Sequence, residues 1–495
     1  MFESAEIGHQ LDKATYKAAL PGLREQLLEC QLELLERGDT AVVVVIAGVE
    51  GAGKGETVNL LNEWMDPRHI ETQAFGPRSE EEKERPPMWR FWRALPPTGK
   101  IGILFGSWYT APILDQVLGD ASDAELNEAL QRIRHFERML ARENVLLIKL
   151  WFHLSRDTQK KRLGKLEKDK QSRWRVTERD WQLFHKFDRF YQVSEQVLRE
   201  TSTAEAPWHV IDGTDHRYRS LTAGRLLLDA MRRRLDHLPG PPTTPPAPLP
   251  QPALDGRNTL NGLDYSLSLD KQGYRKALAH WQQELNRLSR DRRLRDRSVV
   301  LVFEGNDAAG KGGAIRRLTA ALDARYCRVV PVAAPTDEER RQPYLWRFWR
   351  QLPRHGHFTV FDRSWYGRVL VERVEGLCSE QDWMRAYSEI NEFEEQLVDS
   401  GVVLCKFWLA ITPDEQLARF RARQETGYKR FKITDEDWRN REKWPEYERA
   451  VCDMVERTST EYAPWKLVPA NSKRFARIEV LKTVCTTLEV ALSVR

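Results

Sequence analysis

The chain contains one sequence pattern twice, and this repeat limits what the chain can fold into. Adding 257 to a residue number in the first half gives its equivalent in the second half, so residues 48–55 match 305–312 and residues 89–93 match 346–350. The offset holds without a gap across about 160 of the 495 residues. Solenoid repeats run to about 50 residues, which is far shorter than this period. The repeat therefore predicts two tandem copies of one domain.

A proline-rich stretch separates the two copies. Eight of the fourteen residues from Pro239 to Pro252 are proline. Proline lacks a backbone donor and fixes φ, so this stretch cannot form a helix or a central strand. We therefore expect an N-terminal domain over residues 1–238, an extended linker over 239–253 and a C-terminal domain over 254–495. A docking site for a proline-binding partner is the alternative interpretation of the linker.

Composition excludes several classes of protein. The net charge of +5 is too small to mark the whole chain as a nucleic-acid or membrane-surface binder. The apolar run at 41–49 is about half the ~20 residues that a spanning helix needs, and the N-terminus lacks the features of a secretory signal. The six cysteines form no CxxC pair, which argues against a zinc site or disulfide framework. We expect a cytoplasmic protein with no nucleic-acid or membrane partner.

Secondary-structure patterns predict an α/β fold in each copy. Short apolar runs typical of buried strands occupy 298–303, 327–332, 357–361, 402–409 and 465–468. Charged stretches with helical spacing separate them, for example 382–399. Strands that alternate with helices indicate a parallel sheet covered on both faces, with the ligand site at the carboxyl ends of its strands.

A glycine loop follows the first apolar strand of each copy. Residues 305–312 (GNDAAGKG) satisfy the P-loop pattern G-x-x-x-x-G-K, and residues 48–55 satisfy it again. In such a loop the backbone N–H groups and a helix N-terminus bind phosphate, and the lysine adds a positive charge. The expected phosphate-binding residues are Gly305, Asn306, Ala309, Gly310, Lys311, Gly312 and Gly313. Glycine stands where the usual loop has a serine or threonine for Mg²⁺, so Asp307 is the candidate metal ligand within the loop.

A second acidic candidate lies at the end of a later strand. Asp362 has the position of a Walker-B aspartate, and Arg363 and Arg368 follow it. Guanidinium groups suit phosphate oxygens because each presents a rigid fork of donors. The alternative is an exposed Asp–Arg pair with no ligand.

A basic run late in the second copy predicts a lid that closes over phosphates. Residues 419–432 contain six positively charged side chains and one negatively charged side chain. The candidate binding residues among them are Arg419, Arg421, Arg423, Lys429 and Lys432. A solvated helical face is the alternative. Arg347 is a further candidate for contact with the nucleotide. It lies in the aromatic segment YLWRFWR, whose spacing indicates a helix packed mainly in the core.

Together these motifs resemble polyphosphate kinase family 2, P-loop kinases that use inorganic polyphosphate as phosphoryl donor. The resemblance rests on GNDAAGKGG from Gly305, PTDEER from Pro335, YLWRFW from Tyr344, FDRSWYGR from Phe361 and GYKRFKITDEDW from Gly427. It implies a five-stranded P-loop kinase sheet with a helical lid in each domain, and Mg²⁺ as the metal, with Mn²⁺ as a possible substitute. The tandem layout is similar to the family members that phosphorylate AMP.

The family pattern is intact in the second copy only. At the positions of Asp362, Arg363 and Arg368 the first copy has Phe105, Gly106 and Ala111. Glu50 replaces Asp307, although Lys54 remains at the position of Lys311. A phenyl ring cannot coordinate a metal ion. We therefore expect residues 254–495 to catalyse and residues 1–238 to be degenerate and inactive.

The expected reaction is reversible transfer of the terminal phosphoryl group of polyphosphate to AMP, which gives ADP. Asp307 and Asp362 are expected to hold the metal, while Lys311, Arg363 and Arg368 neutralise the transferring phosphate. Three alternatives stay open: ADP or GDP as acceptor, an ATP-dependent nucleoside monophosphate kinase, and a non-catalytic polyanion-binding protein. The sequence also leaves open the reaction direction, the donor length and whether the chain forms a homo-oligomer.

Overall fold

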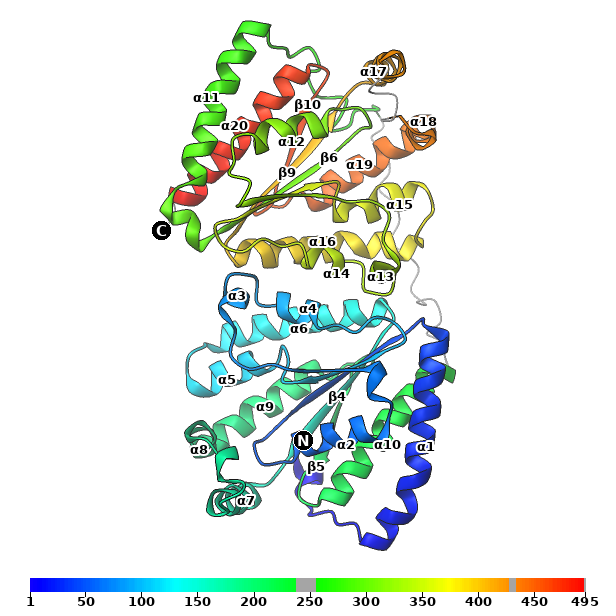
Figure 1. Cartoon of the computed structure of the whole chain (residues 1–495), viewed down its shortest axis with the longest axis vertical. Helices are drawn as coiled ribbons and strands as arrows, with labels where there is room; N and C mark the ends of the chain where they lie inside the picture. The colour runs from blue at the N-terminus through cyan, green and yellow to red at the C-terminus, as the bar shows by residue number, and fades with distance from the viewer. Residues whose placement is uncertain (237–254, 427–432, 494–495) are drawn as a thin grey trace. The chain divides into compact units, whose positions relative to one another are not determined.

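A computed structural model describes residues 1–236, 255–426 and 433–493. The expected linker, 239–253, lies outside the described residues. The chain forms two compact units, each built on one five-stranded sheet with helices on both faces (Figure 1). No described helix combines the length and the apolar character that crossing a bilayer requires.

The two sheets have the same topology. In the first the order is β2-β3-β1-β4-β5, and in the second it is β7-β8-β6-β9-β10. Every pair of neighbouring strands is parallel. The strands are β1 Ala41–Gly48, β2 Ile70–Ala74, β3 Ile101–Phe105, β4 Val145–His153, β5 Trp208–Asp212, β6 Ser298–Gly305, β7 Cys327–Pro331, β8 Phe358–Asp362, β9 Val402–Ala410 and β10 Trp465–Pro469. The α/β fold and the five strands predicted in the second copy are confirmed.

Helices cover both faces of each sheet because the central strands are apolar on both sides. In the first unit one face packs against α1 (Lys13–Arg37), α2 (Lys54–Trp64) and α10 (His216–Asp236). The other face packs against α5 (Thr110–Leu118), α6 (Asp123–Arg142) and α9 (Phe187–Thr201). All of 41–46 in β1 is buried, so strand burial on both faces follows directly from the AVVVVI sequence.

The second unit repeats this arrangement. One face packs against α11 (Lys271–Ser289), α12 (Lys311–Thr319) and α20 (Lys473–Ser493). The other carries α15 (Val371–Val374), α16 (Glu380–Asp399) and α19 (Trp444–Thr458), as Figure 1 shows. The remaining α-helices are α3 Glu80–Lys83, α4 Trp89–Arg93, α7 Arg156–Lys168, α8 Glu178–His185, α13 Asp337–Arg340, α14 Trp346–Trp349, α17 Pro413–Glu425 and α18 Asp435–Glu442. Short 3₁₀ helices span Glu3–Ala5, Pro67–His69, Arg173–Arg175, Arg292–Asp296 and Trp365–Val369.

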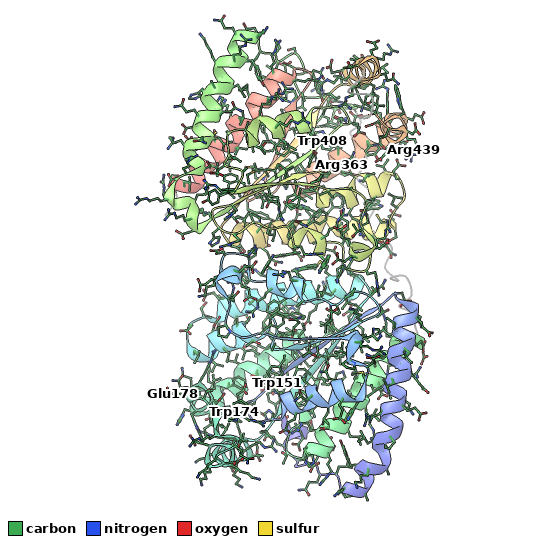
Figure 2. All side chains as sticks on the ribbon, in the orientation of Figure 1. Trp151, Trp174, Glu178, Arg363, Trp408 and Arg439 are labelled. Carbon is green, nitrogen blue, oxygen red and sulfur yellow. The ribbon has the colours of Figure 1, made fainter. Side chains whose placement is uncertain are left out.

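The carboxyl ends of the strands in the second sheet bring distant residues to one edge. Trp408 lies near the end of β9, and Arg363 directly follows β8 (Figure 2). The loop that joins β6 to α12 emerges at the same edge, since β6 pairs with both strands in parallel. This edge is where a ligand site is expected in an open α/β sheet.

Candidate active site

The glycine loop has the geometry that its sequence predicts. Gly305 ends β6 with φ of 149°, and a Cβ there would stand 2.5 Å from the carbonyl oxygen of Leu409. No side chain fits between these two strands, so only glycine is tolerated. Gly310, with φ of 112°, precedes the first residue of α12, Lys311. The N-terminus of α12 therefore opens at the loop, which creates a positive site for an anion.

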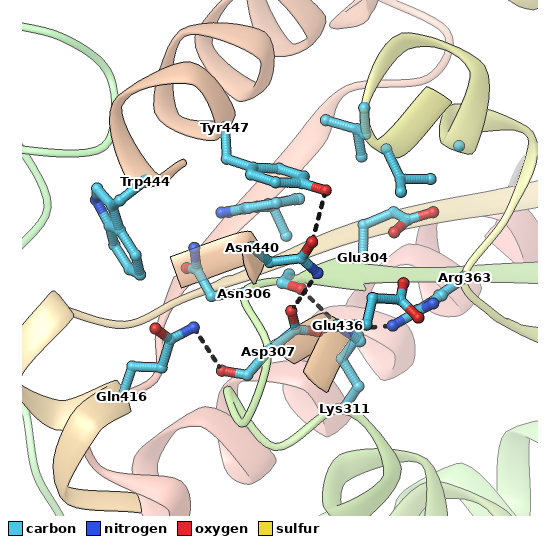
Figure 3. Close-up of a pocket in the computed structure, with 15 residues that line it drawn as sticks. Glu304, Asn306, Asp307, Lys311, Arg363, Gln416, Glu436, Asn440, Trp444 and Tyr447 are labelled. Atoms are coloured by element: carbon cyan, nitrogen blue, oxygen red, sulfur yellow. Dashed lines mark hydrogen bonds and ion pairs between the residues drawn. The ribbon is translucent and has the colours of Figure 1, made fainter. Parts of the chain in front are cut away.

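A pocket lies beside this loop in the second unit (Figure 3). Its lining combines acidic, basic and aromatic side chains from the loop, from the segment after β8 and from α17, α18 and α19. The lining residues are Glu304, Gly305, Asn306, Asp307, Lys311, Arg363, Gly367, Leu370, Val371, Trp408, Gln416, Glu436, Asn440, Trp444 and Tyr447.

Asp307 is at the centre of the contacts in this pocket. Its Oδ2 accepts a hydrogen bond from Asn440 Nδ2 at 2.8 Å, and its Oδ1 lies 3.6 Å from Nη2 of Arg363 (Figure 3). Gln416 Nε2 donates to the main-chain oxygen of Asp307 at 3.2 Å, and Tyr447 donates to Asn440 Oδ1 at 3.1 Å. These contacts fix the carboxylate of Asp307 toward the interior of the pocket.

Lys311 and Glu304 add one charge of each sign. Nζ of Lys311 donates to the carbonyl oxygen of Gly305 at 2.5 Å. Glu304 is buried, and Ser364 Oγ donates to its carboxylate at 2.8 Å. Burial raises the pKa of Glu304, while Lys311, Ser364 and Arg363 oppose this shift. The site therefore holds a buried acidic group close to the cation that is expected to contact phosphate.

Arg363 occupies an unusual backbone conformation. Its φ is 67°, in the left-handed region that residues with a side chain rarely adopt. Burial lowers the pKa of its guanidinium, but Asp307, Glu304, Glu436 and Asp362 more than offset this and leave the pKa raised. Arg363 is thus held as a cation among four carboxylates.

The other candidates around β8 lie outside the lining of this pocket. Asp362 is the last residue of β8, and its main-chain oxygen accepts from Val332 N at 3.0 Å. Arg368 pairs with Glu372, one turn later, at 2.7 Å. Arg347 pairs with Glu339 at 3.5 Å. Of the five residues expected to catalyse, the pocket brings together Asp307, Lys311 and Arg363.

The basic run divides into residues with different positions. Arg419 is buried, and its guanidinium donates to the carbonyl oxygens of Ala308, Ala309, Ala470 and Asn471 at 2.7–2.9 Å. It therefore lies beneath the glycine loop. Arg421 is exposed on α17 and Arg423 is half-buried there. Lys429 and Lys432 lie outside the described residues.

Three lining residues lie outside every motif of the sequence: Asn440, Trp444 and Tyr447, which come from α18 and α19, about 130 residues after the loop. Glu436 of α18 lies within the GYKRFKITDEDW motif but is not among the expected site residues. Only the fold brings these residues to Asp307. Glu304 had a detectable signal, because a charged residue ends an otherwise apolar strand where the first copy has Ala47.

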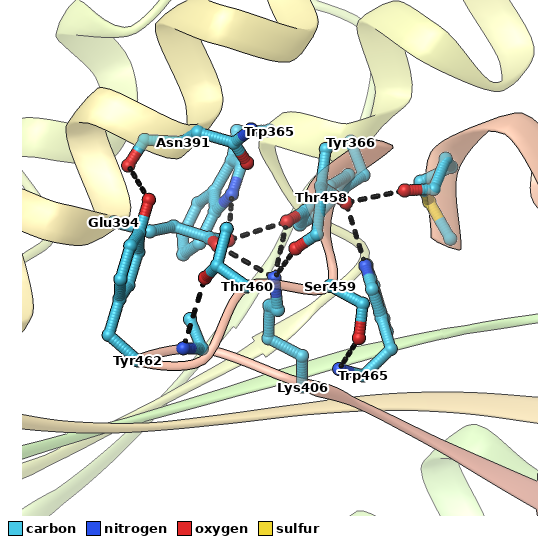
Figure 4. Close-up of polar contacts among 12 residues, drawn as sticks. Trp365, Tyr366, Asn391, Glu394, Lys406, Thr458, Ser459, Thr460, Tyr462 and Trp465 are labelled. Carbon is cyan, nitrogen blue, oxygen red and sulfur yellow. Dashed lines mark hydrogen bonds and ion pairs between the residues drawn. The ribbon is translucent and has the colours of Figure 1, made fainter. Parts of the chain in front are cut away.

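A buried polar network anchors the segment that follows Arg363 (Figure 4). Glu394 accepts from Trp365 Nε1 at 3.0 Å and from Tyr366 Oη at 2.6 Å, and it pairs with Lys406 at 2.7 Å. Lys406 also donates to the carbonyl oxygen of Thr458 at 2.7 Å. Burial raises the pKa of Glu394 and lowers that of Lys406, each opposed by the other's charge. The tryptophan and tyrosine of DRSWY are thus anchored in the interior directly after Arg363 in the chain.

The first unit repeats this network but not the pocket chemistry. Glu137, Tyr109 and Lys149 make the same contacts, with Lys149 Nζ 2.7 Å from Glu137. In the loop, however, Lys54 donates to the carbonyl oxygens of Gly48 and Val49 and pairs with Glu50 at 2.9 Å. Its charge is therefore neutralised within the loop.

The pocket offers oxygen donors of the kind that bind a divalent metal ion. Residues 1–236, 255–426 and 433–493 contain no cluster of three or more His, Cys, Asp or Glu side chains arranged to hold a metal. The lining offers carboxylate and amide oxygens and no thiol or imidazole. Mg²⁺ commonly takes one or two carboxylates and completes its shell with water and phosphate oxygens. The donor set fits Mg²⁺ or Mn²⁺ held partly by substrate.

A parallel sheet of order 2-3-1-4-5, a glycine loop that opens a helix and a lysine at that helix define a P-loop kinase-like phosphotransferase fold. The family model of polyphosphate kinase 2 matches residues 10–238 and again residues 268–494. The chain belongs to the polyphosphate kinase 2 family and contains two tandem domains of it.

Similar proteins agree with this assignment. A polyphosphate:AMP phosphotransferase from Pseudomonas aeruginosa is 55% identical over 491 residues, which covers 99% of each chain. A crystal structure of a polyphosphate kinase 2 from the same species superimposes with a TM-score of 0.91 at 53% identity over both full chains. ADP-polyphosphate phosphotransferase 3 from Rhizobium meliloti is 39% identical but matches 43% of this chain and 76% of its own length.

Proposed function

We propose that this protein transfers the terminal phosphoryl group of inorganic polyphosphate to AMP, and that the reaction is reversible. The observation that supports AMP as acceptor is the extent of similarity. The relative named for AMP matches along both domains, whereas the relative named for ADP matches less than half of the chain.

The chemistry fits this acceptor. The second pKa of a phosphate monoester is about 6, so the AMP phosphate is already a nucleophile near neutral pH. A strong general base is therefore unnecessary. The obstacle is the mutual repulsion of two polyanions, so catalysis depends on positioning and charge neutralisation. Lys311, Arg363 and the N-terminus of α12 surround one edge of the pocket with positive charge and are suited to the transferring phosphate.

We assign the metal to Asp307 together with Asp362. A bound Mg²⁺ or Mn²⁺ would supply charge neutralisation between donor and acceptor phosphates. Asp307 presents its carboxylate to the pocket and is oriented by Asn440. Asp362 is adjacent to Arg363 and contributes to the raised pKa of that guanidinium. Replacing either aspartate by asparagine should lower kcat and raise the Mg²⁺ concentration for half-maximal activity; unchanged Mg²⁺ dependence in both variants would contradict this assignment.

The other expected phosphate contacts are assigned by their positions. Arg419 is a positioning residue for the glycine loop, because its guanidinium already donates hydrogen bonds to four carbonyl oxygens. Arg421, Arg423, Lys429 and Lys432 remain candidates for a lid, while the ion pairs of Arg347 and Arg368 favour roles outside phosphate transfer.

The domain over 254–495 is proposed as the catalytic domain, and that over 1–238 as inactive. Two observations support this division. Lys54 is paired with Glu50 of its own loop, and the first copy has no arginine at the positions of Arg363 and Arg368. The six free cysteines are consistent with a cytoplasmic location.

The test is a nucleotide panel with purified protein. AMP, ADP and GDP are each incubated with polyphosphate and Mg²⁺, and AMP is also incubated with ATP. We expect ADP from AMP and polyphosphate as the fastest reaction. Faster phosphorylation of ADP or GDP, or a requirement for ATP, would assign one of the alternative kinase activities. Salt-dependent polyphosphate binding without any nucleotide product would identify a non-catalytic binder.

A further inference from the structure

A group of cations lies on the α20 side of the glycine loop, outside the lining of the pocket. Arg419 bonds to the loop at Ala308 and Ala309 and also to Ala470 and Asn471, which directly follow β10. It therefore ties the start of α20 to the loop. Lys473 is the first residue of α20, and Arg477 follows one turn later.

Arg477 lies directly against the loop region. A Cβ placed on Gly313, in the first turn of α12, would stand 3.2 Å from Nη2 of Arg477. The glycine at this position leaves room for the guanidinium. Arg477 thus lies beside the start of the helix that carries Lys311, and Lys473 precedes it by one turn on α20.

No carboxylate of the described residues pairs with Lys473 or Arg477. The charged groups that act on Lys473 are Arg419 and Arg423 of α17, Arg477, and the acid Glu415, which bonds to Arg419. Partial desolvation by the surrounding protein, and next the charge of Arg419, lower the pKa of Lys473 to about 8, with Arg423 and Arg477 adding to the effect. Cations gathered in this way repel one another unless an anion lies among them.

The first copy shows that the fold does not require these cations. It keeps the equivalent of Arg419, since Arg162 donates to the carbonyl oxygens of Gly51, Gly213 and Thr214. It does not keep the others: Lys473, Arg477, Arg423 and Gly313 correspond to His216, Ser220, Leu166 and Glu56.

In the first copy a buried arginine side chain occupies the corresponding region beside the glycine loop. Arg219 is buried, donates to Glu56 Oε2 at 2.6 Å, and lies so close to Gly53 that a Cβ there would stand 2.0 Å from its Nη1. The first copy therefore has an internal ion pair in this region, whereas in the second copy no carboxylate of the described residues pairs with Lys473 or Arg477. Because the first copy has the same fold without Lys473 and Arg477, folding does not require these cations. We therefore expect them to bind a ligand.

We propose that Lys473 and Arg477, with Arg423, form a second anion subsite that binds the phosphates of the polyphosphate donor beyond the one being transferred. This inference rests on the proposed function, because only a donor with more phosphates than the pocket uses needs such a subsite. Binding of this remote part of the donor adds affinity that a short donor lacks. The dependence on donor length is the property that identifies the subsite.

The experiment compares Lys473→Gln, Arg477→Gln and the double variant with the wild-type full chain. Lys482→Gln is the matched control, since Lys482 is exposed on the same helix, two and a half turns further along. Equilibrium binding of long-chain polyphosphate and of ATP is measured without acceptor. Initial rates with AMP are then measured with long-chain polyphosphate and with tripolyphosphate.

Each lost cation should weaken binding of long-chain polyphosphate and raise its KM about tenfold. The KM of AMP and the kinetics with tripolyphosphate should change less than twofold, and Lys482→Gln should match the wild type. Unchanged polyphosphate binding in the double variant would overturn the proposal, as would a loss confined to ATP or to AMP. Failure of the proposed function looks different: the wild type would then bind polyphosphate but form no ADP, and the binding arm would still decide the subsite.

Discussion

At two positions, Ala308 and Arg363, the second copy has a left-handed backbone conformation where the first copy has glycine. The φ of Arg363 is 67°, and its equivalent, Gly106, has a φ of 81°. A left-handed conformation costs a residue with a side chain about 1–2 kcal/mol, and glycine avoids this cost. The second copy accepts the strain at the residue whose guanidinium faces Asp307, which is where strain with a functional purpose is expected.

Arg363→Gly should therefore separate activity from stability. We expect kcat to fall about 10²–10³-fold, because one preorganised cation is lost from the transferring phosphate. The free energy of unfolding should not decrease, since glycine relieves the backbone. Initial rates and denaturant titrations of the same preparation measure both. A variant that unfolds more easily while keeping its kcat would contradict this interpretation of the residue.

Lys473 makes the proposed donor subsite sensitive to pH. Its pKa of about 8 lies below the usual 10.5, so the folded protein binds fewer protons than the unfolded chain between these values. Stability from this group therefore rises with pH across that window. Polyphosphate affinity should move the opposite way and fall as the pH rises above about 8, because the ammonium that attracts the anion loses its proton.

Lys473→Arg is the control for this pH dependence. Guanidinium stays charged to pH 12 and above, so affinity in this variant should be nearly constant from pH 7.5 to 9.5. Binding titrations at fixed ionic strength measure the difference. Identical pH profiles for wild type and variant would exclude Lys473 as the titrating group.

At the level of elements, the sequence predicts the sheet better than the pocket. Strands buried on both faces are nearly continuous apolar runs, so each of the five in the second copy could be located within about two residues. The loop, Asp307 and Lys311 follow from a local motif. Asn440 and Tyr447 do not, because their place beside Asp307 depends on how α18 and α19 pack.

Arg419 shows why a charge run does not give the direction of its side chains. The run suggested a lid residue, but this guanidinium points inward to four carbonyl oxygens. Helical spacing gives the face of a residue on α17 but not what lies opposite that face. The repeat held a usable signal: the first copy keeps Arg162 although it has lost Arg363 and Arg368, which is typical of a structural residue.

Arg419→Ala and Arg162→Ala change equivalent residues of the two copies, so their effects can be compared directly. Each should lower the stability of its own domain by about 2–4 kcal/mol, because buried carbonyl oxygens lose their donors. Only Arg419→Ala should also lower kcat, through displacement of the loop that carries Asp307. Denaturant midpoints and kcat at a temperature where both variants are folded test the pair. An equal loss of kcat in both would show that Arg419 acts through general stability.

Across the whole molecule, duplication kept the scaffold and changed the chemistry. Both copies bury a Lys–Glu pair, Lys149–Glu137 and Lys406–Glu394, with contacts of 2.7 Å. Breaking such a pair on one side costs about 3–5 kcal/mol, which explains its retention in a domain without a complete site. The catalytic candidates that differ between the copies, at the positions of Asp307, Asp362, Arg363 and Arg368, end a strand or follow one at the edge of the sheet, where function rather than folding selects them.

The two loop lysines test this division of labour in the intact chain. Lys311 bonds to the Gly305 carbonyl and has no carboxylate partner among the described residues, so its charge is available to phosphate. Lys54 is already paired with Glu50. Lys311→Ala should lower kcat by about 10²–10³-fold, while Lys54→Ala should leave it within twofold.

Rates with AMP and polyphosphate, measured on chains that carry one substitution each, compare the two copies directly. The binding of polyphosphate to each variant adds a second readout, because a first copy that only bound the donor would lose affinity in Lys54→Ala without losing kcat. If Lys54→Ala abolished turnover and Lys311→Ala did not, the catalytic copy would be the first. The self-neutralised lysine would then have to open its pair with Glu50 during each reaction cycle, and Glu50→Gln would make that loop more active.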